Sequence, residues 1–219
     1  RLDRVLKDDI RDLEGLTDIA TLDLLVQLLR TRVGSSIVVS NIAEDLGKSP
    51  KTIAAWIDAL ERMFLIFKVK PFSYNLPRAT RKPFKIFFYD TGDVVGDEET
   101  RFENFVATHL LKHLHFREDY EGDRLELCTI QDKEKREVDF AIIDRSGAKP
   151  RVLELIEVKW SDSEASRHLR YYAERINPHR AVQVGGKPAD ARRLIKKGKL
   201  EIVSAIDEFA QGPWGKKPR

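Results

Sequence analysis

Residues 152–160 read VLELIEVKW, and this stretch decides the fold of the C-terminal half of the chain. Its side chains alternate, so that Leu153 and Leu155 share one face of an extended strand with Glu157 and Lys159. The face therefore begins apolar and ends ionised. We predict a largely buried strand whose last residues form a polar site at one end of a sheet.

A second predicted strand brings another carboxylate to this site. Residues 136–140 read REVDF, and Asp139 precedes Glu157 by eighteen positions (157 − 139). Two convergent carboxylates suit a hard cation such as Mg²⁺ or Mn²⁺, with the backbone carbonyl of Val158 as a third ligand. Lys159 would orient the attacking water and neutralise charge developing on a phosphate. The pattern predicts metal-assisted hydrolysis of a phosphodiester.

A helix upstream of both strands carries a further acid. Residues 101–111 read RFENFVATHLL, and their apolar positions follow helical spacing. Glu103 lies beside the apolar stripe near the start of this helix, which we expect to continue to about residue 114. We predict that Glu103 points towards the same metal and assists catalysis.

These residues resemble the signature of the PD-(D/E)xK nuclease superfamily, although Val138 stands where the signature has proline. The resemblance implies that Asp139, Glu157 and Lys159 are active-site residues of a restriction-endonuclease-like domain with a mixed sheet. Further strands are predicted around residues 124–131, 137–143, 181–184 and 200–203, with a helix over 161–176. This order of helix, strands, helix and strand is that of the nuclease-like core.

The N-terminal half reads as helices followed by two strands. We predict Thr17 as the N-cap of a helix over 18–32, Ser40 as the cap of a short helix, and Ser49 before Pro50 as the start of a helix over 50–62. Strands follow at residues 65–70 and 85–90. This pattern predicts a winged helix-turn-helix, whose second helix would enter the major groove of DNA.

Basic side chains accompany this predicted winged helix at two places. The start of the second helix and the wing supply the expected DNA contacts: Lys48, Lys51, Thr52, Arg78, Arg81, Lys82 and Lys85. Winged helices also mediate protein contacts, and a protein-binding or oligomerisation role stays as the alternative. A polar junction after Gly92 predicts two domains, residues 1–92 and 93–219, in an α/β protein that is α+β overall.

Composition places limits on these functions. The 219 residues hold 39 basic and 36 acidic side chains, so the net charge of +3 requires any nucleic-acid surface to be local. The single cysteine, Cys128, excludes an internal disulfide framework and a cysteine-rich zinc site. No stretch resembles a membrane span or a signal peptide, and we expect a soluble cytoplasmic protein without a membrane partner. Because the only methionine is Met63, we expect the chain to be a piece of a longer protein.

The ordered set of motifs resembles the C-terminal half of prokaryotic AAA-type ATPases that carry a nuclease-like domain of unassigned function. It includes residues 82–92 (KPFKIFFYDTG) and the acids named above. The resemblance implies that ATP binds only an upstream module and leaves open a homo-oligomer through that module. Gly47-Lys48-Ser49 is no P-loop, because Ile42 occupies the position of the first required glycine. The alternative to a nuclease is a non-catalytic DNA- or protein-binding regulatory module.

Overall fold

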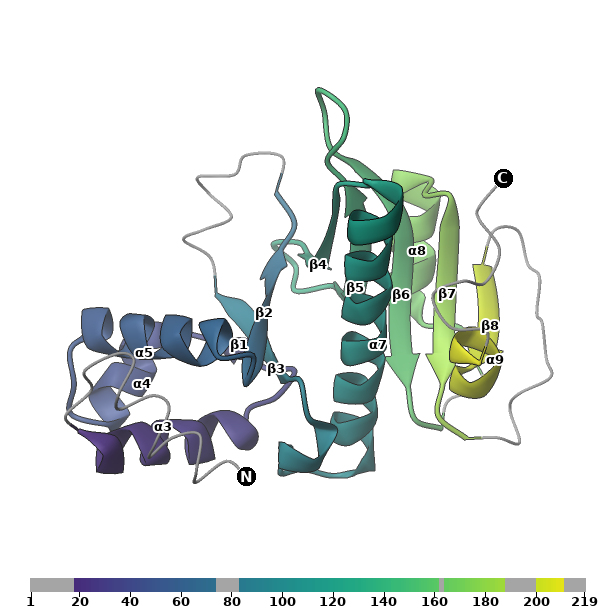
Figure 1. The fold of residues 1–219 in the computed structure, drawn as a ribbon. Helices are drawn as coiled ribbons and strands as arrows, with labels where there is room; N and C mark the ends of the chain where they lie inside the picture. The colour runs from purple at the N-terminus through teal and green to yellow at the C-terminus, as the bar shows by residue number, and fades with distance from the viewer. Residues whose placement is uncertain (1–17, 74–82, 162–163, 188–199, 211–219) are drawn as a thin grey trace. The chain divides into compact units, whose positions relative to one another are not determined.

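The computed structural model describes residues 18–73, 83–161, 164–187 and 200–210. Within these residues it is a mixed α/β protein with six α-helices, a short 3-10 helix and eight strands (Figure 1). The chain divides into two compact units, one within residues 1–68 and 83–104 and the other within 69–82 and 105–219. We call them the N-terminal unit and the C-terminal unit. The expected boundary between residues 92 and 93 falls inside the N-terminal unit.

Three helices build the N-terminal unit: α3 (Ile19–Arg30), α4 (Val39–Asp45) and α5 (Pro50–Arg62). The predicted start of α5 is confirmed, because Ser49 accepts a hydrogen bond of 3.0 Å from the Thr52 N–H. The helices bury the faces that their spacing predicts, namely Leu22, Leu25, Val26 and Leu29 of α3 and Ile53, Ile57 and Leu60 of α5.

Two predicted helix caps are wrong. Asp18 caps α3 by accepting a hydrogen bond of 3.1 Å from the Thr21 N–H, and Thr17 lies outside the described residues. Helix α4 begins at Val39, so Ser40 lies inside the helix and its side chain caps nothing. In the first case an aspartate, an equally favoured capping residue, follows the predicted threonine directly.

The first strand of this unit lies between α3 and α4 in sequence, and the next two follow α5. β1 (Ser36–Ile37) pairs antiparallel with β3 (Phe84–Phe88), with Ser36 opposite Lys85. β2 (Ile66–Pro71) begins in this unit and is the neighbour of β3. A 3-10 turn, η2 (Thr91–Asp93), leads on towards the next helix.

The C-terminal unit holds five strands of the mixed sheet: β4 (Leu125–Gln131), β5 (Glu137–Asp144), β6 (Arg151–Lys159), β7 (Arg180–Gly185) and β8 (Leu200–Ser204). β4, β5 and β6 are antiparallel neighbours, whereas β6, β7 and β8 are parallel. The end of β2 pairs in parallel with β4, which gives the order β1-β3-β2-β4-β5-β6-β7-β8. All five predicted strands of this unit are confirmed to within one or two residues.

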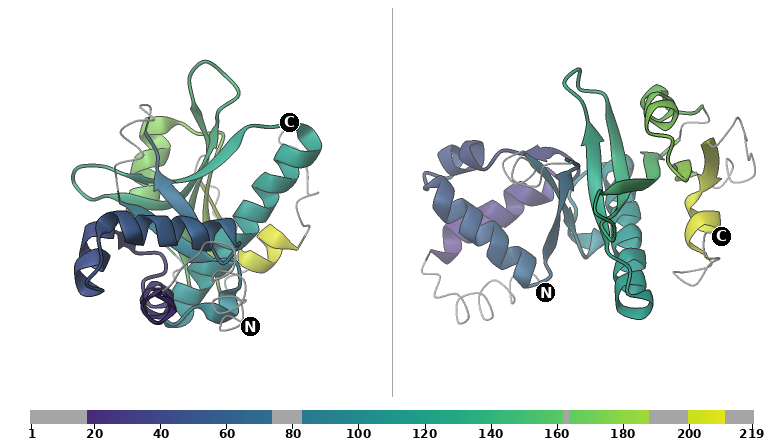
Figure 2. Two further views of the ribbon diagram at one scale, coloured as in Figure 1. Left: turned by 60° about the vertical axis from the view of Figure 1, so that its left-hand side comes forward. Right: turned by 90° about the horizontal axis from the view of Figure 1, so that it is seen from above.

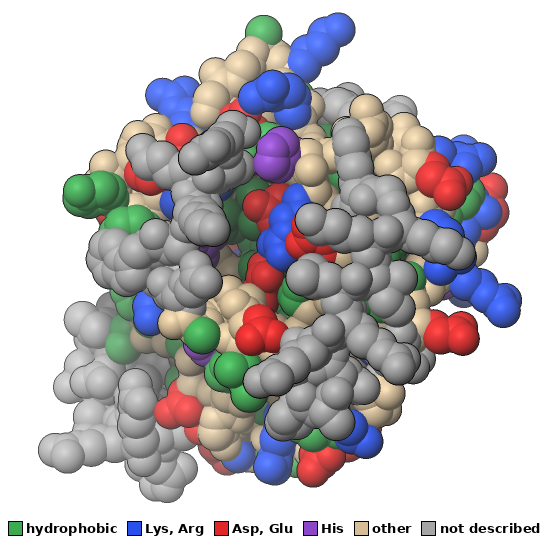
Figure 3. Space-filling view, turned by 90° about the vertical axis from the view of Figure 1, so that its right-hand side faces the viewer, with side chains coloured by type: hydrophobic (Ala, Val, Ile, Leu, Met, Phe, Trp, Pro, Cys, Tyr) green, Lys and Arg blue, Asp and Glu red, His purple; other side chains and the backbone are tan. Residues whose placement is uncertain are grey.

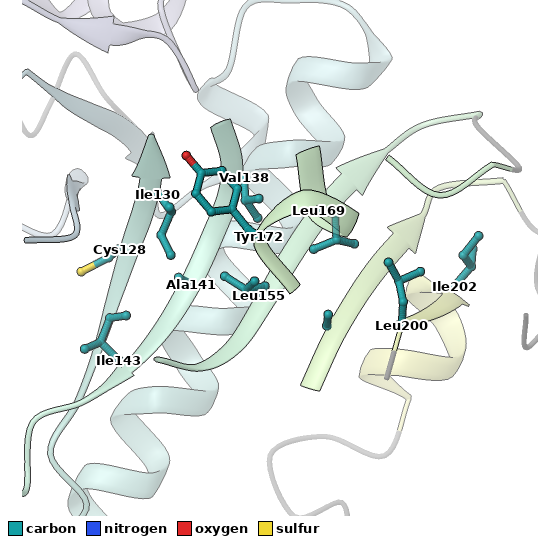
Figure 4. Packing of buried hydrophobic residues seen from close by; sticks show 11 residues of the cluster. Cys128, Ile130, Val138, Ala141, Ile143, Leu155, Leu169, Tyr172, Leu200 and Ile202 are labelled. Carbon is teal, nitrogen blue, oxygen red and sulfur yellow. The ribbon is translucent and has the colours of Figure 1, made fainter. Parts of the chain in front are cut away.

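Helices cover both faces of this part of the sheet (Figures 1 and 2). α8 (Arg167–Ile176) lies on one face, and the C-terminal part of α7 (Glu98–Glu121) lies on the other. Leu169 and Tyr172 of α8 lie over Ala141 and Leu155 (Figure 4). This core is completed by Cys128, Ile130, Val138, Ile143, Ala181, Leu200 and Ile202. The short α9 (Ala205–Phe209) follows β8.

Two helices differ from their predicted lengths. α7 runs for 24 residues, beyond the expected end near Leu114, because Leu114 is still buried and charged residues complete its last turns. α8 begins at Arg167 and not at residue 161, because Ser166 caps it by accepting from the Leu169 N–H. Among the helices that the structure describes, none has both the length and the apolarity needed to cross a membrane.

Candidate functional site

Asp139 lies where the backbone pairing of β5 and β6 ends. The paired register runs as far as Phe140 opposite Ile156, and one further step would place Asp139 opposite Glu157. At this point the Asp139 side chain replaces the backbone as hydrogen-bond acceptor, since its Oδ2 accepts a hydrogen bond of 2.8 Å from the Val158 N–H. The Val158 carbonyl faces the same neighbouring strand, because the N–H and C=O of a strand residue point to one side. Asp139 and Val158 are thereby held at a fixed separation.

Glu157 is the buried member of the carboxylate pair. Its side chain is 5% exposed, and its Oε2 has no hydrogen-bond partner among the described residues. Burial, and next the charge of Asp139, raise the pKa of Glu157 to about 7, whereas Lys159 acts in the opposite direction. Like charges that face each other across a sheet are unfavourable. The pair therefore provides a place where a cation would be stabilised.

Lys159 forms an ion pair with Glu157. Its Nζ lies 3.3 Å from Glu157 Oε1, and its side chain is 32% exposed, which leaves the ammonium group within reach of solvent. The lysine therefore occupies one oxygen of Glu157 and not the other. It is therefore placed to contact both Glu157 and a molecule that approaches from solvent.

Gly186 packs closely against the backbone and side chains at the end of β6. Gly186 follows β7, and its N–H donates a hydrogen bond of 3.1 Å to the Lys159 carbonyl. A Cβ atom at position 186 would overlap the indole of Trp160, so this position requires glycine. The close approach fixes the backbone at the end of β6.

Gln183 holds the loop before α8 against the site. The residue is fully buried in β7 opposite Glu157; its Oε1 accepts a hydrogen bond of 2.8 Å from the Ser166 N–H, and its Nε2 donates one of 2.9 Å to the Glu164 carbonyl. Ser166 in turn lowers the pKa of Glu157 slightly against the larger effect of burial. Gln183 is not among the predicted site residues, although a lone amide within the apolar strand AVQV is a signal that could have revealed it.

The donor set fits a hard divalent cation. An orphaned, buried carboxylate oxygen on Glu157, an adjacent carboxylate on Asp139 and an inward-facing Val158 carbonyl are oxygen ligands of the type that Mg²⁺ and Mn²⁺ prefer. In the part of the chain that the structure describes, no group of three or more His, Cys, Asp or Glu side chains is arranged so that it could hold a metal ion. The remaining ligands would then be water molecules and substrate oxygens.

Glu103 has its own partner in the N-terminal unit. Lys85 Nζ lies 3.4 Å from Glu103 Oε1, and the carboxylate packs against Gly34, whose φ of +72° and crowded surroundings admit no side chain. Next to it, Asn104 of α7 accepts from the Phe88 N–H at 2.8 Å and donates to the Phe88 carbonyl at 2.9 Å. The start of α7 is thus bound to β3.

The predicted DNA contacts fall into four groups. Lys85 is only 7% exposed and pairs with Glu103, so its side chain is not presented to a phosphate, contrary to expectation. Lys48 binds Asp18 at 2.6 Å and lowers the pKa of that carboxyl to about 2, and the Thr52 hydroxyl lies 2.8 Å from that of Ser49. Lys51 is exposed. The remaining predicted contacts lie outside the described residues, at Arg78, Arg81 and Lys82.

A second polar cluster at the β8 edge is internally satisfied. Figure 3 views this edge and shows acidic and basic side chains side by side. Arg180 binds Glu208 through two hydrogen bonds of 2.5 and 2.7 Å, and also pairs with Glu201 and Glu154. This network joins β6, β7, β8 and α9, and a structural role explains it.

Fold and site together define a mixed α/β protein with two carboxylates and a lysine at the ends of two central strands. A family model described as "Domain of unknown function (DUF8612)" matches residues 1–95. No curated protein and no solved structure matches the chain. This description names no activity, and the matched region ends before Asp139, Glu157 and Lys159.

Proposed function

We propose that the C-terminal unit is a nuclease-like domain that hydrolyses phosphodiester bonds of DNA with the help of Mg²⁺ or Mn²⁺. The observation that carries this proposal is the unpartnered, buried Oε2 of Glu157 beside Asp139 and Lys159. A buried carboxylate oxygen without a hydrogen-bond partner destabilises the fold, and such sites are typical of function.

Each side chain has a task in this reaction. Asp139 and Glu157, with the Val158 carbonyl, would hold the metal, which when bound polarises the phosphate and lowers the pKa of water. Lys159, still within reach of solvent, would orient the attacking water and neutralise charge on the phosphate oxygens. Asp139 also fixes the Val158 backbone through its hydrogen bond, and Gln183 keeps the Ser166 loop in place.

The order of elements supports the same proposal. α7, β4, β5, β6, α8 and β7 follow one another as helix, three antiparallel strands, helix and a parallel strand. This order is similar to the core of the PD-(D/E)xK superfamily that the motifs resemble. The acids lie at adjacent strand ends, where that resemblance puts the active site.

For the N-terminal unit we propose a winged helix that binds DNA. The order α3, β1, α4, α5, β2, β3, with β1 beside β3, supports this interpretation. Of the predicted contacts that the structure describes, Lys51 is the one whose charge is exposed without a carboxylate partner among those residues. The proposal that the chain belongs to an AAA-type ATPase of the prokaryotic cytoplasm rests on the motif resemblance alone.

The second candidate is a non-catalytic regulatory module that binds DNA or protein. It is favoured by one observation, namely that Glu103, the expected third acid, already has Lys85 as a partner. Such a module would keep the fold and bind nucleic acid without turnover. The two candidates therefore differ in metal-dependent cleavage.

The test is cleavage of linear, circular and single-stranded DNA by the purified chain with Mg²⁺ or Mn²⁺. We expect cutting by the wild-type chain and its loss in Asp139→Asn and Lys159→Ala, since each change removes a group that acts on the phosphate or its metal. Matched controls are Asp119→Asn and Lys112→Ala, exposed positions on α7 that should cut as the wild type does. Intact DNA in every lane would favour the regulatory module, and cutting by all variants would refute the assigned site.

A further inference from the structure

The outer face of α8 carries three arginines without carboxylate partners. Arg167, Arg170 and Arg175 are exposed, and among the described residues none of them forms an ion pair. Most of the other arginines described in the same unit behave differently, since Arg117, Arg136, Arg145, Arg151 and Arg180 pair with acids. Glu174 is the exposed acid of this helix, so the outer face of α8 is net positive.

Tyr171 orders two of the basic side chains around α8. The Arg136 guanidinium lies 4.1 Å from the ring centroid and the Arg175 guanidinium 3.9 Å from it. Two planar groups at these distances cannot occupy the same face, so the ring separates them. Asp132 and Glu134 balance the charge of Arg136, whereas Arg175 has no such acid among the described residues. An anion from outside would stabilise this arrangement.

The hairpin between β4 and β5 extends the same surface. Lys133 and Lys135 in its turn are exposed. The Tyr172 hydroxyl donates a hydrogen bond of 3.0 Å to the Arg136 carbonyl and so ties the base of the hairpin to α8. At its other side, α8 begins at Ser166, which Gln183 holds next to Glu157. The basic surface therefore adjoins the carboxylate pair.

We propose that Arg167, Arg170 and Arg175 of α8, with Lys133 and Lys135 of the hairpin, bind the phosphate backbone of the DNA duplex whose scissile bond enters the site. This inference rests on the proposed function and adds to it the surface that holds the substrate. Arginines without internal partners suit phosphate oxygens, because the guanidinium forms paired hydrogen bonds. Both faces of the Tyr171 ring are occupied by Arg136 and Arg175, so the tyrosine positions Arg175 and does not stack on bases.

The binding test uses a fluorescently labelled DNA duplex and the Lys159→Ala chain, so that no cleavage interferes. The triple substitution of Arg167, Arg170 and Arg175 by Ala should weaken binding roughly tenfold and lower the slope of log affinity against log salt by about 2.7, as expected for three phosphates. The control replaces exposed Lys112, Arg124 and Lys149 by Ala and removes the same charge elsewhere in the unit. Equal effects of the two triple variants would overturn the proposal.

A second pair of variants tests the role of Tyr171. Tyr171→Leu should weaken binding although it changes no charge, whereas Tyr171→Phe should bind as the Lys159→Ala parent does, because the ring is retained. Unchanged binding by Tyr171→Leu would refute the positioning role. If the wild-type chain binds DNA through this surface but does not cut it, only the proposed hydrolysis is contradicted. If the wild-type chain cuts DNA but the triple arginine variant binds as tightly as its Lys159→Ala parent, only the proposed surface is contradicted.

Discussion

At the level of single residues, Glu157 is the side chain that most needs an external partner. It is buried beside Asp139, and its Oε2 is unsatisfied within the described chain. Its pKa is about 7 in the folded chain against an ordinary 4.5. The folded chain therefore binds more protons at this group than the unfolded chain does between these two values.

The stability of the metal-free protein should follow from this difference. As pH rises from 4.5 to about 7, Glu157 should lower the free energy of unfolding by up to about 3 kcal/mol. The Glu157→Gln side chain does not titrate, so the free energy of unfolding of this variant should rise relative to that of the wild type as pH rises through this range. Denaturant unfolding in a chelator at several pH values measures the difference. A wild-type-to-variant difference that does not change with pH would contradict the prediction.

Gly186 gives a second prediction for a single residue. Gly186→Ala should destabilise the chain by roughly 1–3 kcal/mol, because the added methyl overlaps the Trp160 ring and the site admits no larger group. The same change combined with Trp160→Leu should cost less than the sum of the two single changes. Urea midpoints of the three variants test the coupling, and strict additivity would show that the ring is not the cause. Gly147→Ala is the control, since nothing lies closer than 3.6 Å to a Cβ there.

At the level of elements, alternation and helical spacing predicted most strands and helices because each has one buried face. The strand containing Glu157 is an example, since its apolar start joins the core with α8 and its ionised end forms the candidate site. Helix ends were harder to predict. Threonine and serine are favoured N-cap residues, as at Thr17 and Ser40. The residue at which a helix begins, however, depends on which neighbouring side chain accepts hydrogen bonds from the first free N–H groups of the helix. The contacts of Gln183 could not be predicted, because its partners lie 17 and 19 positions away in the chain.

Gln183 should matter for the loop between β6 and α8. Gln183→Leu fills the same space but leaves the Ser166 N–H and the Glu164 carbonyl unpaired. We expect a loss of about 1–3 kcal/mol in unfolding free energy. We also expect amide exchange at Ser166 to be faster in the variant than in the wild type, whereas exchange at Val182, which lies within β7, should change less. Exchange at Ser166 that stays at the wild-type rate would contradict the assigned role.

At the level of the whole molecule, composition and strand order predicted an α/β protein with a mixed sheet. The extent of each compact unit could not be predicted in the same way. The polar junction after Gly92 suggested a boundary there. However, Asn104 and Glu103 at the start of α7 bind Phe88 and Lys85 of β3, and the N-terminal unit therefore extends to residue 104. Likewise, Lys85 looked like a surface lysine in sequence, and only the fold shows that an acid of a later helix covers its charge.

Metal binding is the most direct test of the central claim, because it does not require the correct DNA substrate. Calorimetric titration of the chain with Mn²⁺ should reveal binding that Asp139→Asn and Glu157→Gln each weaken by at least about tenfold, while Asp119→Asn binds as the wild type does. Such a result would establish the carboxylate pair as a metal site. Equal Mn²⁺ binding by the wild type and both site variants, or no binding by any of them, would contradict the account.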